Sequence, residues 1–159
     1  MIRKTALAFA AALSLTGAAQ AGVYTMTGSY DSTPGTDVLT GSFSFDDAVV
    51  VAGGFDGAFD LTSLTFTFGG TTYTLADATD PYVQFEGGTL TGPNALFATS
   101  GGGTLSLQSF FGSSNFTYTV NNSDTLGTLT VTAVPEPASF ALALAGLGAL
   151  GFAARRRQA

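Results

Sequence analysis

The chain has 159 residues and no cysteine, histidine or tryptophan, which excludes disulfides, thiolate or imidazole metal sites and the usual catalytic triads. Its formal net charge is −6, yet every basic residue lies in an end segment, namely Arg3, Lys4, Arg155, Arg156 and Arg157. Residues 22–134 therefore carry only negative charges, and such a surface repels nucleic acid and anionic lipid.

Residues 1–21 have the three parts of a secretory signal peptide. Arg3 and Lys4 form a positive start, an uninterrupted apolar stretch follows, and Ala19 and Ala21 are the small residues that signal peptidase reads. The apolar stretch is shorter than the roughly 20 residues that a membrane span needs. A buried amphipathic helix is the other interpretation, but this stretch is apolar on all sides. We therefore predict a signal helix that is removed after Ala21.

The middle of the chain has the pattern of short strands separated by glycine turns. Apolar and hydroxyl side chains alternate along residues 38–46, 64–68, 105–107, 116–120 and 129–131. Further short strands are expected at residues 23–30, 82–86 and 95–99. Gly69 and Gly70 supply a two-residue hairpin turn, because glycine readily adopts the positive φ that such turns require.

Each of these strands presents one apolar face, rich in phenylalanine, and one face rich in threonine and serine. A single flat sheet would leave the phenylalanines in water, whereas two sheets packed face to face bury them. We therefore predict an all-β fold, a β-sandwich of about eight or nine short antiparallel strands over residues 22–133. The signal helix precedes this domain, and a C-terminal transmembrane helix follows it.

The C-terminal segment, residues 134–159, has three parts in order. Pro135, Glu136 and Pro137 end the last strand-like run, because the two prolines fix φ and stiffen the chain. Residues 138–154 are uncharged, and their number is near the lower limit for a transmembrane helix. The cluster Arg155, Arg156 and Arg157 should stay cytoplasmic by the positive-inside rule. The tail therefore predicts an anchor that holds the domain outside the inner membrane.

This order of a Pro-Glu-Pro motif, an Ala/Leu/Gly-rich helix and a terminal arginine cluster resembles the PEP-CTERM family of sorting signals. In that family a membrane-embedded exosortase cuts near the Pro-Glu-Pro motif and passes the protein to the cell surface. Such proteins are typical of Gram-negative bacteria that make exopolysaccharide. The resemblance implies transient anchoring in the inner membrane, then a place on the cell surface or in the biofilm matrix. An ordinary single-span anchor behind a proline-rich joint is the alternative.

Little catalytic chemistry is open to residues 22–134. Without cysteine, histidine or lysine, the remaining set is a pair of carboxylates, as in glycoside hydrolases. Calcium is the better candidate ligand because it binds carboxylate and carbonyl oxygens. Its candidate ligands are three aspartate pairs near glycines, Asp46 and Asp47, Asp56 and Asp60, and Asp77 and Asp80. The simpler interpretation is that these are solvated turn residues.

Sugar binding is a further possibility, because tyrosine rings stack on sugar rings. The tyrosines of the domain are Tyr24, Tyr30, Tyr73, Tyr82 and Tyr118. Strand tyrosines are more commonly half core and half surface, with the ring packed and the hydroxyl wet. An exposed row of tyrosines would favour a sugar-binding module, and clustered loop aspartates would favour a calcium-binding one.

The sequence favours a non-enzymatic exported protein of the cell surface or extracellular matrix, with a structural or adhesive role linked to exopolysaccharide. We expect signal peptidase and exosortase as processing partners, no catalytic residue, no cofactor other than the calcium kept open above, and no nucleic-acid partner. The first alternative is a carbohydrate- or calcium-binding β-sandwich module. The second is a small glycoside hydrolase, for which a cleft with two suitably spaced carboxylates would be the sign.

Overall fold

The computed structural model of the chain describes residues 21–134 and 145–146. Its strands are β1 (Ala21–Tyr30), β2 (Asp37–Asp46), β3 (Gly57–Phe68), β4 (Thr71–Thr74), β5 (Ala78–Glu86), β6 (Thr89–Ala98), β7 (Thr104–Phe110), β8 (Ser113–Val120) and β9 (Ser123–Ala133). A short helix α2 (Asp47–Ala52) follows β2, and a 3-10 turn η1 (Leu75–Asp77) follows β4. The predicted signal helix and nearly all of the predicted transmembrane helix lie outside the described residues. Among the residues described, no helix is long and apolar enough to cross a bilayer.

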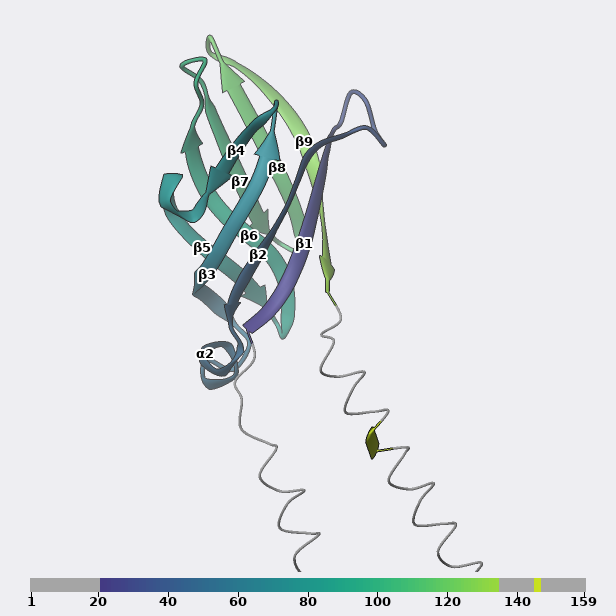
Figure 1. Cartoon of the computed structure of the whole chain (residues 1–159), viewed down its shortest axis with the longest axis vertical. Helices are drawn as coiled ribbons and strands as arrows, with labels where there is room; N and C mark the ends of the chain where they lie inside the picture. The colour runs from purple at the N-terminus through teal and green to yellow at the C-terminus, as the bar shows by residue number, and fades with distance from the viewer. Residues whose placement is uncertain (1–20, 135–144, 147–159) are drawn as a thin grey trace, which may run out of the picture.

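The strands form one antiparallel sheet that closes on itself (Figure 1). The strand order is β2-β1-β9-β8-β7-β6-β5-β3-β4, and β2 also pairs with β3. The first eight strands of that order therefore form a ring, while β4 lies beside β3 as an additional strand. The predicted all-β fold of about eight or nine antiparallel strands is confirmed. The β2–β3 pairing joins the packed walls of this sandwich into a closed sheet.

Phenylalanine fills the interior of the closed sheet. The largest side chains that are almost fully inaccessible are Phe43, Phe45, Phe66, Phe97 and Phe116. Their rings meet edge to face in places, as for Phe66 and Phe97, whose ring centroids are 5.0 Å apart. Such aromatic pairs add to the free energy of burial. The alternation of apolar and hydroxyl residues along each strand is thus the alternation between core and solvent.

Glycine at position 127 makes room for one of these rings. A Cβ atom there would lie 2.2 Å from Cζ of Phe116, closer than any side-chain contact allows. Only a residue without a side chain lets the Phe116 ring approach β9 so closely. The predicted Gly69-Gly70 turn is also confirmed, with φ of 57° and 78° at its two residues.

Helix α2 was not indicated by the sequence pattern, because it is only 6 residues long and rich in valine. The capping residues at its two ends account for the formation of this helix better than its composition does. The carboxylate of Asp46 accepts a hydrogen bond of 2.9 Å from the N–H of Ala48, which caps the first turn. Gly53 ends the helix, and Val50 is the one residue of α2 that is buried against the core.

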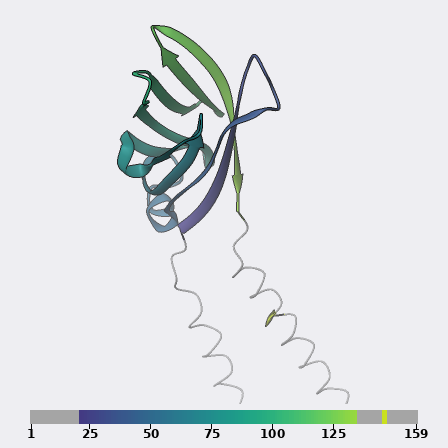
Figure 2. The same cartoon turned by 45° about the horizontal axis from the view of Figure 1, so that its top comes forward.

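Both described ends of the domain lie at the same end of the closed sheet, which we call the tail end (Figure 2). It comprises Ala21, α2, residues 53–56, the turns at 87–88 and 111–112, and Val134. The N–H of Val134 donates a 2.9 Å hydrogen bond to the carbonyl of Val23, so β1 still holds the first residue of the C-terminal segment 134–159. The opposite end carries the loops 31–36, 99–103 and 121–122.

Candidate functional site

The two predicted processing points flank one strand pair. Ala21, the last residue of the predicted signal peptide, is the first residue of β1 and pairs with Asp46. At the other terminus Ala133 is the last residue of β9 and pairs with Tyr24 of β1. The remaining predicted signal residues, Ala19, Pro135, Glu136, Pro137, Arg155, Arg156 and Arg157, lie outside the described residues. Both processing signals thus adjoin the tail end of the closed sheet.

The first predicted aspartate pair lies at the tail end. Asp46 caps α2, and the carboxylate of Asp47 accepts a hydrogen bond from the backbone N–H of Gly22. Partial burial raises the pKa of Asp47, the Gly22 hydrogen bond opposes this, and the negative charge of Asp46 adds to the rise. Burial also raises the pKa of Tyr24, and the Asp47 charge raises it further.

The other predicted aspartates are spread over the sheet. Asp56 accepts a 3.3 Å hydrogen bond from the N–H of Gly87, and Asp60 lies on β3 rather than in a loop. Asp77 accepts bonds from the hydroxyl and the N–H of Thr74, at 2.7 and 2.8 Å, and these bonds lower its pKa. Asp80 lies in a bulge of β5 with φ of 49°. Within the part of the chain that the structure describes, no three acidic side chains converge to hold a metal ion.

Four of the five tyrosines pack on core rings. Tyr24 stacks on Phe45 with centroids 5.2 Å apart, and Tyr73 stacks on Phe66 at 5.3 Å. The ring of Tyr30 is tilted against that of Phe116, and the ring of Tyr118 meets that of Phe68 edge to face. Tyr73 and Tyr118 also line a hollow of about 90 Å³ at the end opposite the tail end. These four tyrosines therefore do not form an exposed row. Tyr82 is the one tyrosine that does not pack on a core ring.

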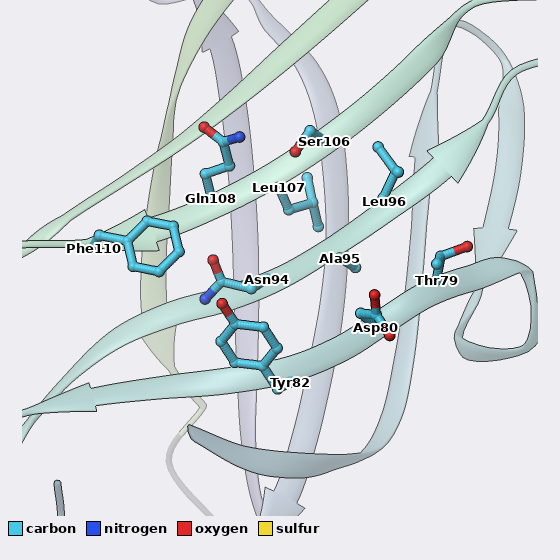
Figure 3. Close-up of a pocket in the computed structure, with 10 residues that line it drawn as sticks. All are labelled: Thr79, Asp80, Tyr82, Asn94, Ala95, Leu96, Ser106, Leu107, Gln108 and Phe110. Carbon is cyan, nitrogen blue, oxygen red and sulfur yellow. The ribbon is translucent and has the colours of Figure 1, made fainter. Parts of the chain in front are cut away.

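Tyr82 lies in a shallow depression of about 200 Å³ on the outer face of β5, β6 and β7 (Figure 3). Its long polar and aromatic side chains come from all three strands. Tyr82 of β5 is the ladder partner of Asn94 of β6, and Gln108 and Phe110 come from the adjacent β7. The rest of the lining is Thr79, Asp80, Ala95, Leu96, Ser106, Leu107 and Phe110. The site offers aromatic faces beside amide groups and hydroxyls.

A buried hydrogen-bond network fixes the floor of the depression. The side chain of Asn94 accepts a 2.9 Å bond from the N–H of Ser109 and donates a 3.4 Å bond to its carbonyl, so an amide side chain replaces a ladder pair. The hydroxyl of Ser109 donates a 2.9 Å bond to the carbonyl of Pro93. The hydroxyl of Ser114 donates to the carbonyl of Thr91. Since these groups are satisfied, they hold β6 and β7 rigidly where the regular ladder stops.

Sequence reasoning missed this site. Residues 91–95 are buried on both faces, so their side chains do not alternate between apolar and polar. Gly92 and Pro93 read as a loop, although both lie in β6. The only available signal was Tyr82, which the sequence grouped with tyrosines that belong to the core.

The fold and the tail together describe an exported domain that is joined at one end to a C-terminal sorting segment. Residues 133–157 match the family described as PEP-CTERM protein-sorting motif. This match confirms the resemblance drawn from the Pro-Glu-Pro motif and the arginine cluster. The chain is thus an exosortase-targeted exported protein, and its sorting signal anchors it in the membrane before processing. No curated protein and no solved structure matches the chain.

Proposed function

We propose that the closed sheet is a non-catalytic adhesive module that contacts exopolysaccharide once the chain reaches the cell surface or matrix. The observation that carries this proposal is the placement of Tyr82 on β5 and Gln108 on β7 on either side of the buried Asn94 of β6. Aromatic faces suit the apolar faces of sugar rings, and amide groups suit sugar hydroxyls as both donors and acceptors. The sorting motif supports this proposal because it marks the chain for export.

The shape of the site favours a polymer over a small molecule. Pockets for small ligands usually enclose roughly 300–1,000 Å³. The depression holds about 200 Å³ and opens outward, while the interior behind it is filled by phenylalanine. A polysaccharide strand that passes over three strands of the sheet uses such an open surface, because each sugar makes a few weak contacts and many sugars add up.

The residues that line the depression also support the proposal that the site is non-catalytic. A glycoside hydrolase needs two carboxylates on either side of the bond that it breaks. Asp80 is the one acidic residue among the side chains that line the depression. The proposal therefore assigns no reaction to this site. Binding without cleavage is what an adhesive or structural role requires.

The test is affinity electrophoresis of the exported protein in gels that contain exopolysaccharide from the producing strain. Tyr82→Ser and Gln108→Ala should each weaken the retardation about fivefold, which corresponds to about 1 kcal/mol per contact. Leu126→Ser is the matched control, because Leu126 is an exposed side chain on β9 and is absent from the depression. Equal retardation of the Tyr82, Gln108 and control variants would overturn the proposed site. Release of reducing sugars by the wild-type protein would favour the hydrolase instead.

A further inference from the structure

Exposed apolar side chains gather at the tail end. The large ones there are Val49, Val51, Phe55, Phe110, Phe111 and Val134, which come from α2, the loop after it, the β7–β8 turn and the end of β9. Phe111 is 96% exposed, and Val51 is 58% exposed. By contrast, Leu96 and Leu126 lie apart from one another on the outer faces of β6 and β9. A cluster of this kind on one end of a domain indicates an interaction surface.

The backbone conformation of Phe111 is a second sign that this side chain makes a contact. Phe111 and Gly112 form the two-residue turn between β7 and β8, with φ of 53° and 73°. Turns of this type favour Asn-Gly, because an aromatic residue is strained at positive φ. The chain therefore keeps a phenylalanine where both its hydration and its backbone conformation are unfavourable. Such a position points to a contact that compensates for both.

Glu86 holds this turn in place from the neighbouring hairpin. Its two carboxylate oxygens accept hydrogen bonds from the N–H groups of Phe111 and Gly112, at 2.9 and 3.0 Å. The same hairpin is tied to the loop after α2, because the N–H of Gly88 donates a 3.0 Å bond to the carbonyl of Phe55. Phe55 and Phe111 are thus presented from one hydrogen-bonded set of turns. The carboxylate of Glu86 is engaged by these two N–H groups, which lowers the cost of bringing it near an apolar surface.

The sorting segment determines what this end faces. The match to the sorting motif begins at Ala133, which is still paired within β9. Only residues 135–137 separate Val134 from the start of the predicted membrane span at residue 138. Four peptide steps extend at most about 14 Å. The headgroup layer is about 5–8 Å thick, so Val134 lies no more than about 9 Å above the membrane surface while the chain is anchored.

We propose that the tail end docks on the lipid bilayer before processing, with Phe111 inserted among the lipids and Val51 and Phe55 beside it. The ligand is a zwitterionic lipid surface, since Asp46, Asp47 and Asp56 lie at this end and repel anionic headgroups. Apolar side chains at such a surface gain free energy in proportion to the area removed from water. This docking precedes the glycan contact on β5, β6 and β7, and the two surfaces share Phe110, which also lines the depression.

The test uses the full chain, exported by a host without exosortase and reconstituted in phosphatidylcholine vesicles. The chain has no tryptophan, so Phe111→Trp introduces a single tryptophan, which can be excited selectively beside the five tyrosines. We expect a blue-shifted emission and at least about a twofold loss of intensity when the lipids carry bromine atoms on the upper acyl chain. Leu126→Trp is the control, and its emission should be the same with and without bromine.

Two results would overturn the proposal. Equal emission of the two variants in brominated vesicles would place Phe111 in water. A blue shift at Phe111→Trp without quenching by bromine would place the ring against protein, such as a second copy of the chain.

A second reporter separates docking from folding. Val51→Trp should also be quenched by brominated lipid, and the added change Phe111→Asn should reduce this quenching by half or more. Because asparagine suits the turn, the melting temperature of Phe111→Asn in detergent should equal or exceed that of the parent. Unchanged quenching of Trp at position 51 in the double variant would remove Phe111 from the docking surface.

Discussion

The carboxylate of Asp47 accepts a hydrogen bond from the backbone N–H of Gly22. Gly22 is the residue that signal peptidase is expected to leave as the first of the mature chain. Cleavage would therefore convert an amide N–H into an α-ammonium group beside a carboxylate whose pKa burial has raised. The mature domain would gain its one cation in residues 22–134 at the place where a negative charge is most costly.

This relationship predicts a pH-dependent gain in stability on processing. The α-amino group has a pKa of about 7.7–8.0 when unfolded, and a facing carboxylate raises that pKa in the folded state. The gain is thus complete below about pH 7.7 and is lost as the pH rises through the folded pKa. For a partly exposed pair we expect about 0.5–1 kcal/mol.

The measurement compares the melting temperature of the mature chain with a free Gly22 amine and with the same amine acetylated. The free form should be more stable at pH 6, and the two forms should agree at pH 10. Asp47→Asn should abolish the difference at pH 6. Equal melting temperatures of the free and acetylated wild-type chains at pH 6 would show that the amine and Asp47 do not pair.

Gly127→Ala should destabilise the fold by about 1–3 kcal/mol, because the new methyl group must displace the Phe116 ring from the wall of the sheet. Gly101→Ala is the matched control, since a Cβ at that loop position meets nothing within 4 Å. Its effect should stay within about 0.5 kcal/mol. Thermal unfolding of both variants in the same buffer decides this, and equal losses would contradict the packing of Phe116 against β9.

Added salt should raise the melting temperature of the mature domain. Its titratable charges in residues 31–124 are all carboxylates, and their repulsion is screened by ions. The predicted calcium ligands give this experiment a second comparison, with calcium against sodium at equal ionic strength. Calcium should have the larger effect only where carboxylates form a site that binds it in the folded state. Equal effects of the two ions would mean that charge screening is the whole effect. If neither ion changed the melting temperature, the predicted repulsion between carboxylates would be contradicted.

Processing should remove both ends of the chain in the exporting host. Intact-mass analysis of protein released from the cell surface should give a form that begins at Gly22 and ends near Pro135, Glu136 and Pro137. The sorting motif over residues 133–157 is the reason for the C-terminal loss. A main species that retains Arg155, Arg156 and Arg157 would indicate a permanent single-span anchor.

The strands could be predicted from the sequence wherever one face is buried and the other is wet. Along β2, Leu39, Phe43 and Phe45 are buried, and their spacing alone gives the strand and its inner face. Along β6 this signal fails between Thr91 and Asn94, because both faces are covered there. Proline is tolerated in that strand since β6 has separated from β7 and a side-chain network replaces the ladder.

The sorting signal could be predicted from the sequence, whereas the depression could not. The signal is a linear motif whose parts follow one another, so it can be recognised without any fold. The depression depends on Tyr82, Asn94 and Gln108, which come from three strands and meet only through the register between them. No spacing in the sequence encodes that register, because it follows from a bulge at residues 80–81 and from the packing of the whole sheet.

The membrane anchor leaves the domain from β9, and β9 is hydrogen-bonded to β1 on one side and to β8 on the other. A pull on the membrane anchor before processing would therefore load β9 along its own length. The bonds of both ladders run across that direction, so they bear the load in shear and together. A tether on the outlying strand β4, which pairs through 4 residues on one side, would instead peel off one bond at a time. Because β9 is paired on both sides, the anchored domain resists being pulled apart better than any single hydrogen bond of its ladders would.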